Sequence, residues 1–194
     1  MLVDVIQSFV DFCTKFISQG GILFGFILIL LESFLPVLPL GVFVALNVNA
    51  FGGILGIFIS WIATCIGCYL SFLLFSFLSE KLLYQFLSKK TLKKIENSII
   101  KFRNISFSNL VLVVALPFTP AFLVNIICGV VGMSHKKFLV AVAIGKVFML
   151  LFWGYVSKSF IESMTDINTI IIISLMLVVA YIISKIVSKK VNLD

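Results

Sequence analysis

Residues 105–134 read ISFSNLVLVVALPFTPAFLVNIICGVVGMS, and this stretch decides how the rest of the chain is interpreted. It is largely apolar, and basic residues flank it at 101–103 and 135–137. Its length of about 30 residues is too great for one transmembrane helix, which needs about 20, and too small for two. Pro117 and Pro120 break a helix at its centre. The stretch therefore predicts a re-entrant hairpin that opens on the cytoplasmic side, where basic flanks are retained.

The composition indicates an integral membrane protein with a single membrane domain. Of the 194 residues, 61% are hydrophobic and 12% are charged, whereas soluble domains have about 25% charged residues. The net charge of +7 comes from lysines beside apolar runs, which is typical of topology signals and contacts with anionic lipid headgroups. We expect membrane lipids as partners and no nucleic acid, and a homo-oligomer is compatible with this composition.

The first half of the chain has an apolar run that must fold back. Residues 1–19 have a helical period of apolar side chains, which predicts an amphipathic interfacial helix. They lack the basic start and apolar run of a cleavable signal peptide. Residues 20–78 carry one formal charge, Glu32. We place the first hairpin's break at Pro36 and Pro39, which form another P-x-x-P, and a full span at residues 54–78.

The second half repeats this plan after a basic segment. Residues 79–104 predict a cytoplasmic amphipathic linker on the membrane surface, and a solvated linker with topogenic lysines is the alternative. Residues 105–156 hold the second hairpin and a span that begins at Phe138. Residues 157–194 hold a last span and a basic tail. We expect a multi-pass protein of the cell membrane with a cytoplasmic C-terminus.

The two halves share an order of features: a P-x-x-P, an asparagine, a G-x-x-G and a full span. The shared positions are Pro36 and Pro117, Asn47 and Asn125, Gly53-x-x-Gly56 and Gly129-x-x-Gly132. With the first hairpin open outside and the second inside, they predict an all-α polytopic fold. That fold is an inverted repeat of re-entrant hairpin plus transmembrane helix, with an extra C-terminal helix. In transporters of this plan, sites lie where broken helices meet near the membrane midplane.

Both halves resemble a known family. The run Pro117-Phe118-Thr119-Pro120-Ala121-Phe122-Leu123-Val124-Asn125, followed by Gly129, resembles the second signature of the DedA superfamily, most closely its SNARE-associated (VTT-domain) branch. Glu32, Pro36, Pro39 and the step at 51–56 resemble the first signature. The resemblance implies paired re-entrant hairpins and the translocation of a phospholipid or a polyprenyl phosphate between leaflets.

The chain departs from this pattern at three positions. Many relatives carry an arginine where Val114 stands, and DedA-type members carry another where Pro120 stands. A second acidic residue of the pattern falls on Gly41. These departures argue against tight phosphate binding by arginine and against a two-carboxylate proton relay.

Two charges are expected inside the membrane, Glu32 and Lys146. A buried carboxylate costs several kcal/mol unless it is protonated or paired, which suits Glu32 to a proton-coupled switch. Its alternative is an interfacial position in water without a role. Lys146 is expected to face a cavity, where it pairs with Glu32 or meets a lipid phosphate, and its alternative is to snorkel.

The predicted pathway for substrate or protons includes the hairpin residues as well. Asn47 and Asn125 are expected chiefly to satisfy backbone groups freed by the prolines, with headgroup contact as the alternative. The helix that follows Pro120 offers unpaired N–H groups to a phosphate. The full set of predicted site residues is Glu32, Pro36, Pro39, Asn47, Pro117, Pro120, Asn125, Gly129 and Lys146.

Enzyme chemistry is not expected. Cys65 and Cys68 form a C-x-x-C among apolar neighbours, where cysteine packs as a small hydrophobe. His135 is the sole histidine, so we expect no metal site, no Ser-His-Asp arrangement and no cofactor. The sequence thus favours lipid translocation, flippase- or scramblase-like and coupled to protons through Glu32. Its alternatives are a secondary transporter of a small ion or solute and a non-catalytic membrane assembly factor.

Overall fold

The computed structural model describes residues 2–34, 40–77, 101–162 and 167–191. These residues form helices, and no strand occurs among them. The all-α class is therefore confirmed for the described part of the chain. The helices are α1 Leu2–Phe34, α2 Leu40–Phe51, α3 Gly53–Phe77, α6 Phe107–Ala115, α7 Ala121–Val130, α8 His135–Glu162 and α9 Ile167–Val191.

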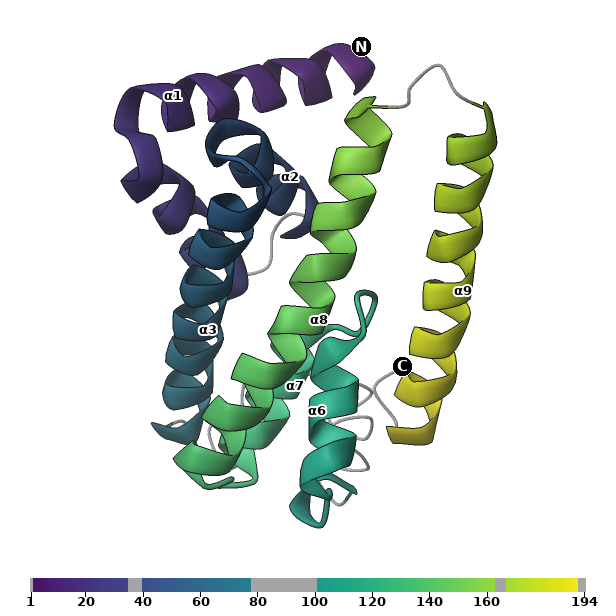
Figure 1. Ribbon diagram of the computed structural model, residues 1–194. Helices are drawn as coiled ribbons and strands as arrows, with labels where there is room; N and C mark the ends of the chain where they lie inside the picture. Colours follow the sequence, from purple (N-terminus) through teal and green to yellow (C-terminus); the bar gives the residue numbers. More distant parts are fainter. Residues whose placement is uncertain (1, 35–39, 78–100, 163–166, 192–194) are drawn as a thin grey trace.

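Two long apolar helices form the centre of the molecule. Gly53–Phe77 and His135–Val156 are each long and apolar enough to cross a membrane. These are α3 and the greater part of α8, and both lie where the sequence predicts full spans. The helices pack against each other and run in opposite directions (Figure 1). The broken segments pack around them, so these two helices position the site described below.

The first broken segment begins with a bent helix. Gly21 has φ 58 and ψ −148, and the helix α1 bends there. The part before Gly21 crosses one end of the molecule, and the part after it descends beside α3 (Figure 1). The helix ends at Phe34, and α2 begins at Leu40. The predicted break at Pro36 and Pro39 falls between these bounds, outside the described residues, as does most of the basic linker at 79–104.

The second broken segment is interrupted where its prolines predict. The helix α6 has 9 residues and α7 has 10, so each is about 15 Å long, half of the hydrocarbon thickness of about 30 Å. Leu116 is extended, with ψ 129, because a following proline disfavours the helical conformation. The chain rises along α6, turns, and returns along α7 to the same end (Figure 1). Its re-entry into a membrane stays a prediction.

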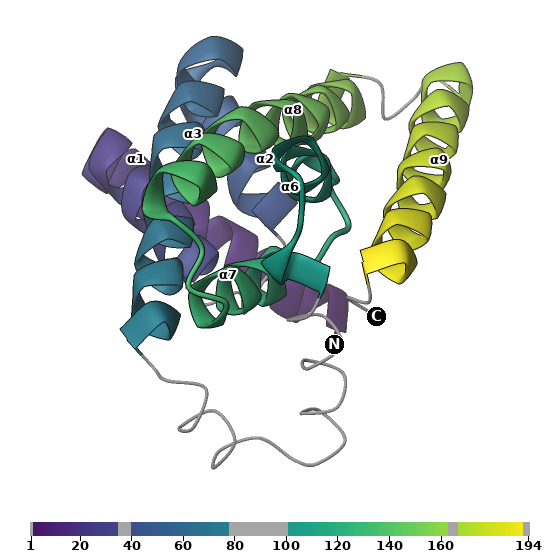
Figure 2. The ribbon, with the colours of Figure 1, turned by 90° about the horizontal axis from the view of Figure 1, so that it is seen from below.

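The packing partners of the short helices alternate between the halves. The helices α1 and α6 pack against α3 and α8, the long helices that follow them in the chain. The helices α2 and α7 pack against the long helix of the other half, α8 and α3 respectively, and α2 also contacts α3. The two halves therefore interlock. The helix α9 contacts α8 and α6 and lies to one side of the bundle (Figure 2).

Glycines permit these close contacts and the turns between helices. A Cβ on Gly67 of α3 would lie 2.6 Å from the carbonyl oxygen of Leu30, and one on Gly145 of α8 would lie 2.9 Å from that of Val111. Gly52 (φ 84) and Gly132 (φ 69) adopt left-handed conformations at the turns that lead into α3 and α8. Gly52 and Gly132 therefore hold equivalent places in the two halves. The predicted G-x-x-G motifs instead paired Gly56 with Gly132.

Candidate functional site

A cavity of about 250 Å³ lies where both broken segments approach α8. Four of the nine predicted site residues line it: Glu32, Pro117, Pro120 and Lys146. The remaining lining comes from α1, α2, α3, the second break, α7 and α8, with the residues Ser33, Leu40, Cys68, Thr119, Ala121, Phe122 and Met149. Residues far apart in the sequence thus share one cavity, and among the described helices of the two halves each contributes except α6.

Lys146 is the most deeply buried charge among the described residues. Its side chain is 1% exposed, and its Nζ donates a hydrogen bond to Sδ of Met149 at 3.2 Å. An ammonium group has three donors, and a thioether sulfur is a weak acceptor. A buried charge is costly without strong partners, and the one hydrogen bond that Lys146 donates within the described structure goes to this weak acceptor.

Glu32 faces the same cavity from α1, and its side chain is half-buried. The positive charge of Lys146 attracts the Glu32 carboxylate. The two groups form no direct ion pair within the part of the chain that the structure describes. The Glu32 carboxyl and the Lys146 ammonium therefore line one cavity without forming an ion pair with each other.

Two hydroxyl groups in the cavity wall were not predicted as site residues. Ser33 is 9% exposed and Thr119 is 6% exposed, and within the described ranges neither hydroxyl has a hydrogen-bond partner. A buried polar group without a partner costs about 1–3 kcal/mol. Both adjoin predicted site residues, since Ser33 follows Glu32 and Thr119 precedes Pro120. Other serines and threonines also occur in the apolar runs of the sequence. The residues next to Ser33 and Thr119 therefore gave no signal that these two hydroxyls line a cavity.

Asn47 lies away from the cavity and has a structural role different from the predicted one. Its Nδ2 donates to the carbonyl oxygen of Gly25 at 3.3 Å and to Oγ of Ser60 at 3.2 Å. Ser60 Oγ in turn donates to the carbonyl oxygen of Gly56 at 2.6 Å. The prediction that Asn47 satisfies backbone freed by the prolines is therefore wrong. Its bonds link the middle of α1, α2 and the start of α3.

The remaining predicted residues also lie outside the cavity wall. Asn125 is buried in α7, and its Nδ2 has no hydrogen-bond partner among the described residues. Gly129 lies against α3, where an added Cβ would be 2.7 Å from the carbonyl oxygen of Phe72. Its role is close helix packing. Pro36 and Pro39 lie outside the described residues.

Tight packing explains two of the departures from the family pattern. Val114, where the family pattern described above has arginine, is 6% exposed and packs within the buried apolar core. Gly41 stands where a second acidic residue is expected, and a Cβ there would meet the Trp153 ring at 2.7 Å. The Trp153 ring thus leaves no room for a side chain at Gly41, and a charge at Val114 would lie within the apolar core. Lys146 is therefore the cation that the cavity offers.

The cysteines and the histidine lie in packed surroundings. Cys65, Cys68 and Cys128 are free thiols, and Cys68 and Cys128 belong to the buried apolar core around α3, α7 and α8. His135 begins α8, and its Nδ1 is 3.0 Å from Oη of Tyr69. These contacts agree with packing roles for the C-x-x-C pair, and they place His135 at the junction of α3 and α8.

The fold and the cavity together define a class: a helical membrane protein with a buried polar site between two broken segments. The chain belongs to the VTT-domain family, because the VTT domain matches residues 35–159. The resemblance to the VTT branch of the DedA superfamily is thereby confirmed.

Two relatives come from Bacillus subtilis (strain 168). The chain is 31% identical over 189 residues to the "Uncharacterized membrane protein YhjE", and the match covers 95% of this chain and 85% of the relative. It is 29% identical over 136 residues to the "Uncharacterized protein YqeD", covering 68% of this chain and 64% of the relative. No solved structure matches the chain. A membrane location is supported by the name of the first relative and by the apolar helices.

Proposed function

We propose that this protein moves a phosphate-bearing lipid, a phospholipid or a polyprenyl phosphate, between the two leaflets of the cell membrane. The observation that carries the proposal is the cavity in which Lys146, Glu32 and two unpartnered hydroxyls meet at the junction of the broken segments. Such a cavity offers the headgroup a polar path, while the hydrocarbon chains stay in the membrane. Its lateral surroundings are apolar helices.

The donors around the cavity suit a phosphate. The ammonium of Lys146 supplies charge, and the hydroxyls of Ser33 and Thr119 supply hydrogen bonds. The helix α7 begins beside the cavity, since Pro120, Ala121 and Phe122 line it, and no side chain caps this helix start. Unpaired N–H groups at a helix N-terminus attract anions. In this proposal Lys146 and the start of α7 replace the arginines of other family members.

Glu32 provides a means of coupling to protons. When ionised, it competes with a phosphate for Lys146, and when protonated, it leaves Lys146 to the phosphate. The groups facing it across the cavity are the ammonium of Lys146 from α8 and the thiol of Cys68 from α3. We therefore propose that protonation of Glu32 favours headgroup entry and that its deprotonation favours release.

A flip assay tests the proposed function. The purified full-length chain is reconstituted into liposomes with a fluorescent phospholipid, and dithionite quenches the label in the outer leaflet. The assay is run at an acidic and a neutral pH, beside Glu32→Gln. We expect protein-dependent flip that varies with pH in the original chain and not in Glu32→Gln.

The outcomes separate the alternatives. Flip that is indifferent to Glu32→Gln keeps lipid translocation and discards the proton coupling. Absence of flip with phospholipid is followed by the same assay with a labelled polyprenyl phosphate. Absence of flip with both lipids contradicts the proposal and directs attention to uptake of a small solute by the same liposomes.

A further inference from the structure

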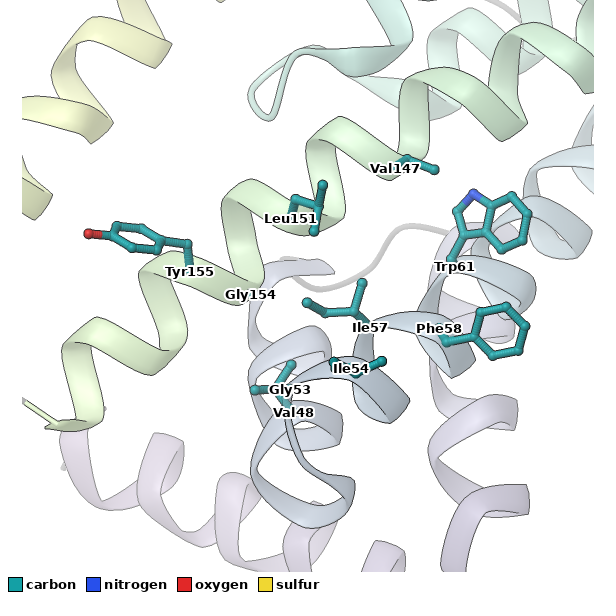
Figure 3. A pocket seen from close by; sticks show the side chains of 10 residues that line it. All are labelled: Val48, Gly53, Ile54, Ile57, Phe58, Trp61, Val147, Leu151, Gly154 and Tyr155. Carbon is teal, nitrogen blue, oxygen red and sulfur yellow. The ribbon is translucent and has the colours of Figure 1, made fainter.

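A second, larger cavity lies between α3 and α8, away from the polar site. This groove has a volume of about 610 Å³, within the range of about 300–1,000 Å³ for small-molecule sites. One wall comes from the start of α3 and the other from α8, and Val48 of α2 closes the floor (Figure 3). The polar cavity uses other residues of these helices, so the two sites are distinct.

The walls of the groove are apolar. Among the described residues, no charged side chain lines it. The indole of Trp61 contributes a ring, and its Nε1 donates to the carbonyl oxygen of Ala143 at 2.8 Å. The polar atom of Trp61 is thus satisfied within the protein, and the bond joins α3 to α8 near one end of the groove. The hydroxyl of Tyr155 is the polar side-chain group that remains, and this side chain is 54% exposed. The lining therefore suits a hydrocarbon and offers no partner to a headgroup.

The groove is continuous with the apolar surface of the two long helices. Ile54 is 91% exposed, Phe58 53% and Leu151 50%, and all three line it. The helices that carry them are those long enough to cross a membrane. In a bilayer, this surface contacts lipid chains and not water, so the medium next to the groove's opening is hydrocarbon.

The shape of the groove is built into the packing. A Cβ on Gly154 of α8 would lie 2.7 Å from Cδ1 of Ile57, so the helices touch there. A Cβ on Gly53 would have nothing within 4 Å, which leaves open space at the start of α3. Gly154 thus allows the two helices to pack closely, and Gly53 leaves the groove unfilled at the start of α3.

We infer that this groove is a binding site for one hydrocarbon chain of a membrane lipid. The site differs from general solvation of the protein by lipid, because its walls and its floor come from three helices held by packing and by the Trp61 hydrogen bond. The inference goes beyond the proposed function, and it holds whether or not the protein moves lipid between leaflets.

Quenching of Trp61 by a brominated lipid tests the site. The full-length chain with Trp153→Phe has Trp61 as its single tryptophan, since the sequence contains two. The purified protein in detergent micelles is titrated with phosphatidylglycerol that carries a dibrominated stearoyl chain. We expect quenching that saturates at a low lipid-to-protein ratio.

Two substitutions from opposite walls fill the groove, and a third is their control. Gly53→Leu and Val147→Phe are expected to raise the half-saturating lipid concentration about tenfold, because overfilled sites accept a ligand poorly. Ile144→Phe is the matched control on α8, because Ile144 is 41% exposed, Val147 is 38% exposed, and Ile144 does not line the groove. In Ile144→Phe, the half-saturating lipid concentration is expected to stay within about twofold of that of the protein that carries Trp153→Phe alone. Size-exclusion profiles confirm that each variant is folded.

Two results would overturn the inference. Quenching that rises in proportion to lipid and is equal in all variants shows lipid solvation without a site. Quenching that is absent while the protein forms dimers sensitive to Gly53→Leu shows that a second copy of the chain covers the groove. A flip assay on the same variants tests the proposed function and not the groove. A variant that loses flip but keeps saturable quenching would count against the proposed function alone.

Discussion

The segment α1–α3 and the segment α6–α8 have the same order of helices, but they contribute different chemistry. In both, a helix ends at a break, a short helix follows, and a left-handed glycine leads into a long helix. The first segment brings the acid Glu32 to the polar cavity, and the second brings the base Lys146 and the broken start of α7. The cavity is therefore asymmetric, although the arrangement of helices around it is similar.

The asparagines show the difference most clearly. Asn47 uses its amide to join α1, α2 and α3 through two hydrogen bonds. Asn125 holds the corresponding place after the second P-x-x-P, but in the described structure its Nδ2 has no partner. The first segment is thus joined through the amide of Asn47, whereas in the second segment Lys137 Nζ of α8 donates to the carbonyl oxygen of Ile105, just before α6, at 2.6 Å. Asn47 therefore has a structural role in the first segment that Asn125 does not have in the second.

The largest effect is expected from Lys146→Met. This change keeps the length of the side chain and removes the charge, so the cavity loses its cation. A charge-assisted hydrogen bond contributes about 1.5–3 kcal/mol, and we expect the flip rate to fall about 10- to 100-fold. The measurement is the dithionite assay, with membrane insertion checked by yield in the membrane fraction. Lys136→Met on the exposed start of the same helix is the control. A normal flip rate in Lys146→Met would remove Lys146 from the mechanism.

The next effect concerns the two asparagines and measures stability. Asn47→Leu removes two buried hydrogen bonds, and we expect a loss of about 2 kcal/mol in the free energy of unfolding. Asn125→Leu removes a donor without a partner and is expected to cost less than about 1 kcal/mol. Denaturant titration of both variants in detergent compares them directly. Equal losses would contradict the structural role assigned to the Asn47 amide.

A double substitution tests whether the acid and the base act together. We expect Glu32→Gln to lower the flip rate about tenfold. Because Glu32 acts through Lys146 in the proposed mechanism, the double variant Glu32→Gln/Lys146→Met should be no slower than Lys146→Met alone. Rates from the same liposome assay give the coupling. Fully additive losses would show that the two residues act independently across the cavity.

The smallest effect is expected from the cavity hydroxyls. Thr119→Val retains the shape of the side chain and removes a buried hydroxyl without a partner, so stability should be unchanged or slightly higher. The flip rate should fall about threefold, because one hydrogen bond to the headgroup is lost. Ser33→Ala is the counterpart from the first segment and should have a similar effect. Melting temperature and flip rate are measured on both, and a rate change that simply follows stability would speak against headgroup contact.

Local chemistry explains which features were predictable. Prolines act on their own backbone and on the preceding residue, so the break at Pro117 and Pro120 could be located from the sequence. Lys146 and Glu32 could be found because charges in apolar runs are rare. Ser33 and Thr119 could not, since a hydroxyl in an apolar helix acquires meaning only from its neighbours. The role of Asn47 was misjudged for the same reason: its partners Gly25 and Ser60 lie on other helices.

The sequence by itself determined the class of the protein, the positions of its two long helices and the break at Pro117 and Pro120. Apolar length, basic flanks and paired prolines are properties of contiguous residues, and the prolines also carry part of the family resemblance at 32–56 and 117–129. The tertiary structure decided which of these residues meet. It brought Glu32 and Lys146 to one cavity, placed Gly129 and Gly145 in helix contacts, and opened the groove between α3 and α8. The reason is physical: cavities and contacts depend on how helices far apart in the chain pack, and the short α2 and α7 cross to the long helix of the other half.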